Sequence, residues 1–122
     1  MIINICFGTS DLERAGRFYD ALTAELGCAR SMQTEKSIHW TNPAMGIGFA
    51  VTLPWDGKPA TAGNGVMATI GAPDRATVDR LYAAALANGG SDEGGPGQRE
   101  NGYYVAYWRD PDGNKMNGVA LG

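Results

Sequence analysis

Apolar residues follow a helical period in two parts of the chain and a strand period in several others. The chain starts with MIINICFG, an apolar and β-branched run that predicts a strand over residues 1–8. Ser10 and Glu13 then have the spacing of a capping box, so we expect a helix to begin at Ser10 and to end at Gly27 in a left-handed conformation. The residues at helical spacing that would form its buried face are Leu12, Ala15, Phe18, Leu22 and Leu26.

Three short segments after this helix predict strands, and the segment after them predicts a linker. The strands are expected in CARSM, KSIHW and GIGFAVTL, which occupy residues 28–32, 36–40 and 46–53. Residues 54–65, PWDGKPATAGNG, are rich in glycine and proline and cannot hold a regular element. We therefore expect this tract to join two separate groups of helix and strands.

The same order of elements is predicted again after the linker. VMATIG indicates a strand over residues 66–71, and Asp74 is placed to cap a second helix. Residues 89–102, GGSDEGGPGQRENG, indicate a glycine-rich loop, and YYVAYW indicates a strong strand. The face of the second helix would consist of Val78, Leu81, Tyr82, Ala85 and Leu86.

The last two strands are predicted to form a tight hairpin. The turn is the sequence DPDGN, in which Pro111 presets φ and Gly113 takes the position that needs a positive φ. KMNGVAL then predicts the returning strand. Strand, helix and strands thus occur twice, about 63 residues apart, from Asn4 to Met67. Neither half is large enough to bury a core alone, so we expect module one (about 1–57) and module two (about 64–122) to form a single domain over residues 1–122.

Composition and charge exclude several classes of function. The chain has 122 residues and a net charge of −3, without the basic patch that nucleic-acid binding needs. No apolar run is long enough to span a bilayer, and the basic residues are scattered, so no membrane partner is expected. The first residues lack a secretory pattern, which predicts a cytoplasmic protein, and Cys6 and Cys28 are expected to be free thiols.

Three segments together resemble one protein family. GTSDLERAGRFYDALTAELG, GNGVMATIGAPDRATVDRLYAAALANGG and GYYVAYWRDPDGNKMNGV are similar to the glyoxalase/bleomycin-resistance/extradiol-dioxygenase superfamily, also called vicinal oxygen chelate proteins. The resemblance implies an α+β fold of two βαβββ modules, whose curved mixed sheets surround a cleft. It also implies a homodimer and, in many members, a divalent metal in the cleft.

The positions that carry metal ligands in this family hold poor ligands here. The resemblance assigns the two usual histidines to Asn4 and Met67, and the usual carboxylate after the turn to Asn117. An amide oxygen is neutral and weak, and a thioether is soft and suits Cu(I) rather than Mg²⁺, Mn²⁺ or Fe²⁺. We therefore expect no metal and no other cofactor at this place. Met67 could fill space, and the two asparagines could bind each other or water.

Other candidates for chemistry are few. His39 is the only histidine, and it is the one obvious general base, although a single histidine beside Trp40 is also typical of a structural residue. Cys6 lies two residues after Asn4, so both side chains share a face of the strand. Nothing nearby in sequence would lower the pKa of its thiol, which favours an inert cysteine.

Aromatic residues on the predicted strands indicate a pocket for a small molecule. Alternation places Tyr103, Val105 and Tyr107 on one face of their strand, and Trp108 on the opposite face, in the core. In the similar fosfomycin-resistance proteins the positions of Val105 and Tyr107 face the ligand. Rigid aromatic walls with a few polar groups are typical of small-molecule sites. The complete set that we expect to line the cleft is Asn4, Cys6, His39, Met67, Tyr103, Val105, Tyr107 and Asn117.

Two classes of function remain open. The first is a metal-free protein that binds a small apolar or aromatic molecule, as bleomycin-resistance proteins bind their drug. The second is a lyase, isomerase or dioxygenase of the same superfamily with an atypical site, in which His39 or a tyrosine would act. The lost metal ligands favour the first class. The fold cannot identify the ligand, because this superfamily performs many reactions on one scaffold.

Overall fold

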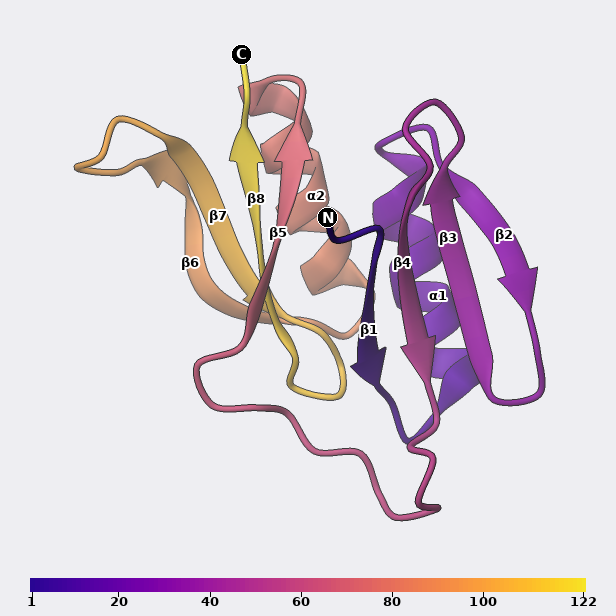
Figure 1. The fold of residues 1–122 in the computed structure, drawn as a ribbon. Coiled ribbons are helices and arrows are strands. Elements are labelled where there is room, and N and C mark those ends of the chain that lie inside the picture. The colour runs from indigo at the N-terminus through magenta and orange to yellow at the C-terminus, as the bar shows by residue number, and fades with distance from the viewer.

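Two helices and eight strands follow one another in two βαβββ modules, in a computed structural model that describes residues 1–122 (Figure 1). Module one consists of β1 (Asn4–Gly8), α1 (Leu12–Ala24), β2 (Ala29–Gln33), β3 (Ser37–Asn42) and β4 (Ile47–Thr52). Module two consists of β5 (Met67–Ala72), α2 (Arg75–Ala87), β6 (Ser91–Gln98), β7 (Tyr104–Arg109) and β8 (Lys115–Ala120).

Each module forms one four-stranded mixed sheet. The strand orders are β1-β4-β3-β2 and β5-β8-β7-β6, and in each sheet the end strand β1 or β5 is parallel to its neighbour while the other pairs are antiparallel. The predicted fold class is confirmed. Because β1 and β5 are end strands, each has one edge that is not paired within the chain.

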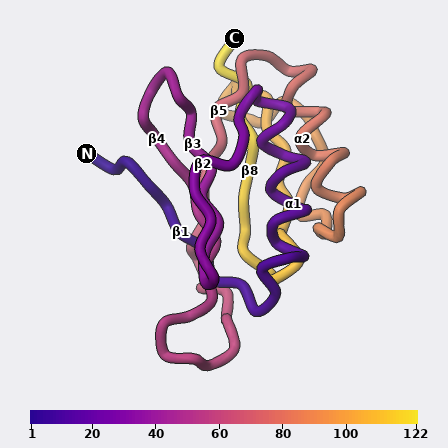
Figure 2. The backbone as a smooth tube through the Cα atoms, turned by 90° about the vertical axis from the view of Figure 1, so that its right-hand side faces the viewer, coloured from indigo at the N-terminus to yellow at the C-terminus, as the bar shows by residue number.

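Both helices lie on the same side of the two sheets, which leaves the opposite faces open (Figures 1 and 2). A single hydrophobic core lies between the sheets and helices and takes side chains from both modules, including Phe18 of α1 and Trp108 of β7. Neither helix is both long and apolar enough to cross a membrane. The side chains on the open sheet faces therefore lie outside the hydrophobic core.

The helix caps agree with the sequence in module two and differ in module one. Asp74 caps α2, and its carboxylate accepts a hydrogen bond from the Thr77 amide at 2.8 Å, as predicted. The expected capping box at Ser10 is wrong, because Asp11 is the N-cap of α1 and accepts from the Arg14 amide at 3.0 Å. Ser10 instead accepts from the Ala60 amide, which fixes the linker against the start of α1.

The glycine-rich segment that was expected to be a loop contains a strand. Residues 91–98 form β6, which pairs with β7 through two register shifts, between Asp92 and Gly94 and between Gly94 and Gly97. Glycine is unfavourable in strands, so the sequence signal was weak. The ladder with the strong strand β7 overrides that local preference.

The β7–β8 hairpin joins the two modules. Gly113 has a φ of 92°, as the turn sequence predicts, and the hairpin reaches the end of β1, where Asn114 donates to the Gly8 carbonyl at 3.0 Å. Asp112 forms an ion pair with Arg14 of α1 at 2.8 Å and also accepts from the Ser10 amide. The modules are therefore held together at the end of the molecule where β1 ends and β8 begins.

Candidate functional site

Three of the predicted site residues share the open face of the first sheet. Asn4 and Cys6 alternate with the core-facing Phe7 in β1, so their side chains point away from α1. His39 of β3 belongs to the same face, because the register aligns His39 with Ala50 of β4 and Ala50 with Cys6. Module one thus presents an amide, a thiol and an imidazole on one surface.

These three groups do not form a catalytic unit within one chain. Two strand spacings separate Cys6 from His39, or about 10 Å, which is too far for proton transfer. The His39 ring has the Ser37 hydroxyl as a hydrogen-bond partner, 3.3 Å from Nε2. Desolvation by the surrounding sheet raises the pKa of Cys6, which makes the thiol less nucleophilic at neutral pH.

The open face of the second sheet centres on Tyr107 and Asn117, which lie directly opposite each other on β7 and β8. Val105 belongs to the same face two residues earlier, although it is buried, and Met67 of β5 is paired with Lys115 beside them. Tyr103 lies before β7 and is largely exposed, outside the strand face on which it was expected.

Two features make the Tyr107–Asn117 pair unusual. The side chain of Asn117 is buried, with only 5% of the residue exposed, and its Oδ1 accepts no hydrogen bond. Two cations approach the half-buried ring of Tyr107: the Arg99 guanidinium carbon lies 5.5 Å from the ring centroid and Lys115 Nζ lies 5.6 Å from it. A buried unpaired acceptor is costly unless something else supplies a donor.

The positions to which the family resemblance assigns metal ligands hold weak ligands for a hard divalent ion in this chain. The set is two amides and a thioether, from Asn4, Asn117 and Met67, without a charged ligand, and no group of three or more His, Cys, Asp or Glu side chains is placed to bind an ion. Within one chain the three are also apart. Met67 is level with Lys115, next to the hairpin that meets Gly8, whereas Asn4 is four residues away along β1, or about 13 Å.

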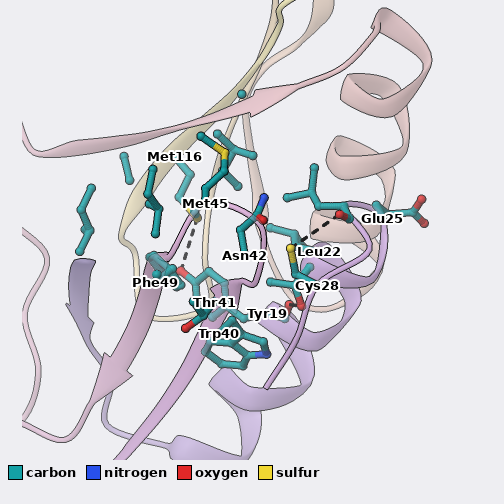
Figure 3. A pocket seen from close by; sticks show the side chains of 18 of the residues that line it. Tyr19, Leu22, Glu25, Cys28, Trp40, Thr41, Asn42, Met45, Phe49 and Met116 are labelled. Atoms are coloured by element: carbon teal, nitrogen blue, oxygen red, sulfur yellow. Dashed lines mark hydrogen bonds between the residues drawn. The ribbon is translucent and has the colours of Figure 1, made fainter. Parts of the chain in front are cut away.

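A cavity of about 430 Å³ lies between the modules at the end away from the hairpin (Figure 3). Its walls are mainly apolar and aromatic, with Tyr19 of α1, Trp40 of β3 and Phe49 of β4 on one side and the edge of β5 on the other. Polar groups at its border include Asn42 and the Cys28 thiol. A volume of this size suits a small organic molecule.

None of the predicted cleft residues lines this cavity. Trp40 and Phe49 belong to the helix-facing side of β3 and β4, where they contact each other and Tyr19 of α1, with ring centroids 4.6 to 6.3 Å apart. Their alternation in the sequence predicts a core. Because the two modules separate at this end, part of that core becomes the wall of the cavity. The separation depends on tertiary packing that no local sequence pattern reveals.

The fold is that of a known structural group. A crystal structure of a glyoxalase/bleomycin resistance protein from Albidiferax ferrireducens T118 is similar over 100% of this chain and 99% of that chain, with 37% identity and a TM-score of 0.92. A glyoxalase-related enzyme from Fulvimarina pelagi is similar over 98% of this chain and 87% of that one, with 23% identity and a TM-score of 0.79. Lactoylglutathione lyase from Agrobacterium tumefaciens has a TM-score of 0.71 at 21% identity, over 99% and 93% of the two chains.

Comparison at the sequence level gives the same result for the family and nothing finer. No curated protein matches the sequence. The family model described as Glyoxalase/Bleomycin resistance protein/Dioxygenase superfamily matches residues 2–117. The chain therefore belongs to the glyoxalase/bleomycin resistance protein/dioxygenase superfamily.

Proposed function

We propose that this protein is a metal-free binding protein for a small molecule with an aromatic or apolar body, and that two copies of the chain form the site. In the dimer, the sheet face of module one from one copy, with Asn4, Cys6 and His39, lies opposite the face of module two from the other copy. The observation that carries this proposal is the Tyr107–Asn117 pair, a half-buried ring beside a buried amide oxygen that has no partner.

The arrangement of the two faces favours a site between copies. In one chain Asn4 is about 13 Å along β1 from the level of Met67, so the two predicted halves do not converge. A two-fold dimer could bring the complementary halves together and cover the free edges of β1 and β5. The dimer would also bury exposed apolar residues next to these edges, among them Ile2, Ile3, Met67 and Leu121.

Binding without turnover fits the chemistry of both faces better than catalysis does. No charged metal ligand is present at the family positions, and His39 has a hydroxyl neighbour but no carboxylate to orient it. The cysteine on the same face has a raised pKa. A lyase, isomerase or dioxygenase would need His39 or Tyr107 to act alone as a proton donor or acceptor.

Two free thiols, Cys6 and Cys28, are consistent with a cytoplasmic location.

The direct experiment is to purify the protein from cells, unfold it, and identify by mass spectrometry what is released. We expect a small aromatic or apolar molecule at up to one per site and no stoichiometric divalent metal. A tightly bound divalent ion whose removal abolishes a turnover would contradict the proposal and favour the enzyme.

The inter-module cavity is the competing location for the same ligand, and two variants separate the locations. Tyr107→Ala removes the ring from the sheet face, whereas Cys28→Phe places a large group in the cavity. We expect Tyr107→Ala to weaken binding of the released molecule at least tenfold and Cys28→Phe to leave it unchanged. The opposite result would transfer the proposed function to the cavity.

A further inference from the structure

Glycines in β6 give a long basic side chain access to the sheet face. Arg99 follows β6, and its guanidinium turns back along the strand, where Nη2 donates to the Gly95 carbonyl at 2.8 Å. A Cβ at Gly97 would lie 2.9 Å from Arg99 Nη1, and a Cβ at Gly94 would lie 3.4 Å from Nη2. Side chains at these two positions would therefore occupy the space through which Arg99 reaches Tyr107.

Two cations on this face have no acidic partner. The five ion pairs of the structure include neither Arg99 nor Lys115, and Glu93, which belongs to β6, is already paired with Arg109. Both cations lie within 5.6 Å of the same ring centroid, so they are at most about 11 Å apart. Both residues are half-buried, so salt and water screen their charges less than in free solution. Because neither has an acidic partner, this face carries a local positive charge in a chain of net charge −3.

We propose that this surface, formed by Arg99, Lys115, Tyr107 and Asn117, selects an aromatic carboxylate that also carries a hydrogen-bond donor such as a hydroxyl. The proposal rests on the proposed function and specifies its ligand. The carboxylate neutralises Arg99 and Lys115, and guanidinium groups bind carboxylates with matched geometry. The aromatic body lies against the Tyr107 ring. The donor satisfies the Asn117 Oδ1, which is buried and accepts no hydrogen bond within the chain.

Hydroxybenzoates and their amides test the charge requirement. The three hydroxybenzoate isomers are titrated into the wild-type protein, with dissociation constants from calorimetry and backbone amide shifts of Tyr107 and Lys115 from NMR. We expect the best isomer to bind at least tenfold more tightly than its own amide, and also more tightly than benzoate, which lacks the hydroxyl. Equal binding of acid and amide at this face would overturn the carboxylate specificity and leave the proposed function standing. If neither compound nor the cell-derived ligand shifts these resonances, both proposals fail.

Matched variants test the residues. Gly97→Ala should displace the flexible end of Arg99 without disturbing the fold, whereas in Gly95→Ala the new Cβ meets nothing closer than the Tyr82 hydroxyl at 3.9 Å. We expect Gly97→Ala, Arg99→Met and Lys115→Met each to weaken hydroxybenzoate binding at least fivefold, and Gly95→Ala to change it less than twofold. The amide should bind equally to all of these variants. If the three variants keep the acid-over-amide preference of the wild type, the assignment is wrong.

Discussion

The hydroxyl of Tyr19 in α1 donates a hydrogen bond to the carboxylate of Asp110, 2.5 Å away at the start of the β7–β8 turn. Both residues are buried, and they belong to different modules. Asp110 also accepts from the side-chain and backbone nitrogens of Asn114, whose side chain in turn donates to the end of β1. The pair therefore couples the turn that begins β8 to the helix of the other module.

Tyr19→Phe should destabilise the protein by about 1.5–3 kcal/mol, because hydrogen bonds to charged groups have this magnitude and the carboxylate stays buried. The measurement is urea unfolding at pH 7. Tyr103→Phe is the matched control, since the Tyr103 side chain is exposed and its hydroxyl makes no hydrogen bond within the chain. It should change the free energy of unfolding by less than about 0.5 kcal/mol. Equal stabilities of the two variants would show that the Tyr19–Asp110 bond contributes nothing.

The same pair predicts a loss of stability at alkaline pH. Burial, and then the charge of Asp110, raises the pKa of Tyr19 well above its usual value of 10.0. An unfolded tyrosine loses its proton near pH 10, so above this pH the native state binds more protons than the unfolded state. Stability must then fall as the pH rises through this window. The urea midpoint should fall more steeply between pH 9 and pH 11 in the wild type than in Tyr19→Phe, and parallel curves would contradict the burial of this phenol.

Gly113→Val should cost about 1–3 kcal/mol, because a β-branched residue resists the φ of 92° that this turn position requires. Space does not limit the change, since a Cβ at Gly113 would meet only Ala62, at an ordinary 3.6 Å. Gly113→Asn separates conformation from side-chain size, because asparagine tolerates positive φ better, and it should cost less. Ligand binding should weaken in the valine variant as well, since the hairpin positions Asn117. An unchanged melting temperature in Gly113→Val would show that the turn adopts another conformation in solution.

The sequence predicted those elements whose signals are local. Asp74 and Gly113 act as their residue types suggest, because a cap and a turn depend on backbone geometry within a few residues. The cap of α1 was misplaced by one residue, since Ser10 and Asp11 are both good caps and the contact between Ser10 and Ala60 comes from the distant linker. β6 was missed because its glycines weaken the strand signal.

The candidate site was less predictable from the sequence, because its geometry depends on contacts between segments that are not neighbours in the chain. Alternation correctly placed Asn4 with Cys6, and Tyr107 opposite the core residue Trp108. It could not reveal that Arg99 turns back over the glycines of β6, because that path depends on the absence of side chains on a neighbouring segment. That the two sheet faces share one cleft stays a prediction, because it requires a second copy of the chain.

Ile3→Asp should convert the predicted dimer into a monomer. Ile3 is 70% exposed, and its carbonyl accepts from the Gly48 amide, so it extends the free edge strand β1. A carboxylate at this position would be buried without a partner in a dimer that covers this edge. Trp55→Asp is the control, because Trp55 is 90% exposed but belongs to the linker. Sedimentation at micromolar concentration should give a dimer for the wild type and for Trp55→Asp. A monomeric wild type would contradict the prediction.

Restoring a metal site tests which chains contribute to the cleft. Asn4→His, Met67→His and Asn117→Glu together would supply two imidazoles and a carboxylate, a set that suits divalent iron, manganese or zinc. The triple variant should bind about one ion per chain, with modest affinity because supporting hydrogen bonds are missing. The wild type should show no specific divalent binding by calorimetry. An ion bound by the wild type with site-like stoichiometry would instead favour the enzyme.

A hybrid dimer then separates a shared cleft from a cleft within one chain. One chain carries only Asn4→His, and a second chain with a different affinity tag carries Met67→His and Asn117→Glu. If each site combines Asn4 of one copy with Met67 and Asn117 of the other, the purified heterodimer contains one complete site and should bind about one ion, while both parent homodimers bind none. If the three residues converge within a chain, no combination of these two chains completes a site, whereas the triple variant would bind metal even when Ile3→Asp makes it monomeric. We expect that monomer to bind no metal, because the 13 Å offset along β1 leaves Asn4 out of reach of Met67 in one chain. Metal binding by the monomer would refute the shared cleft.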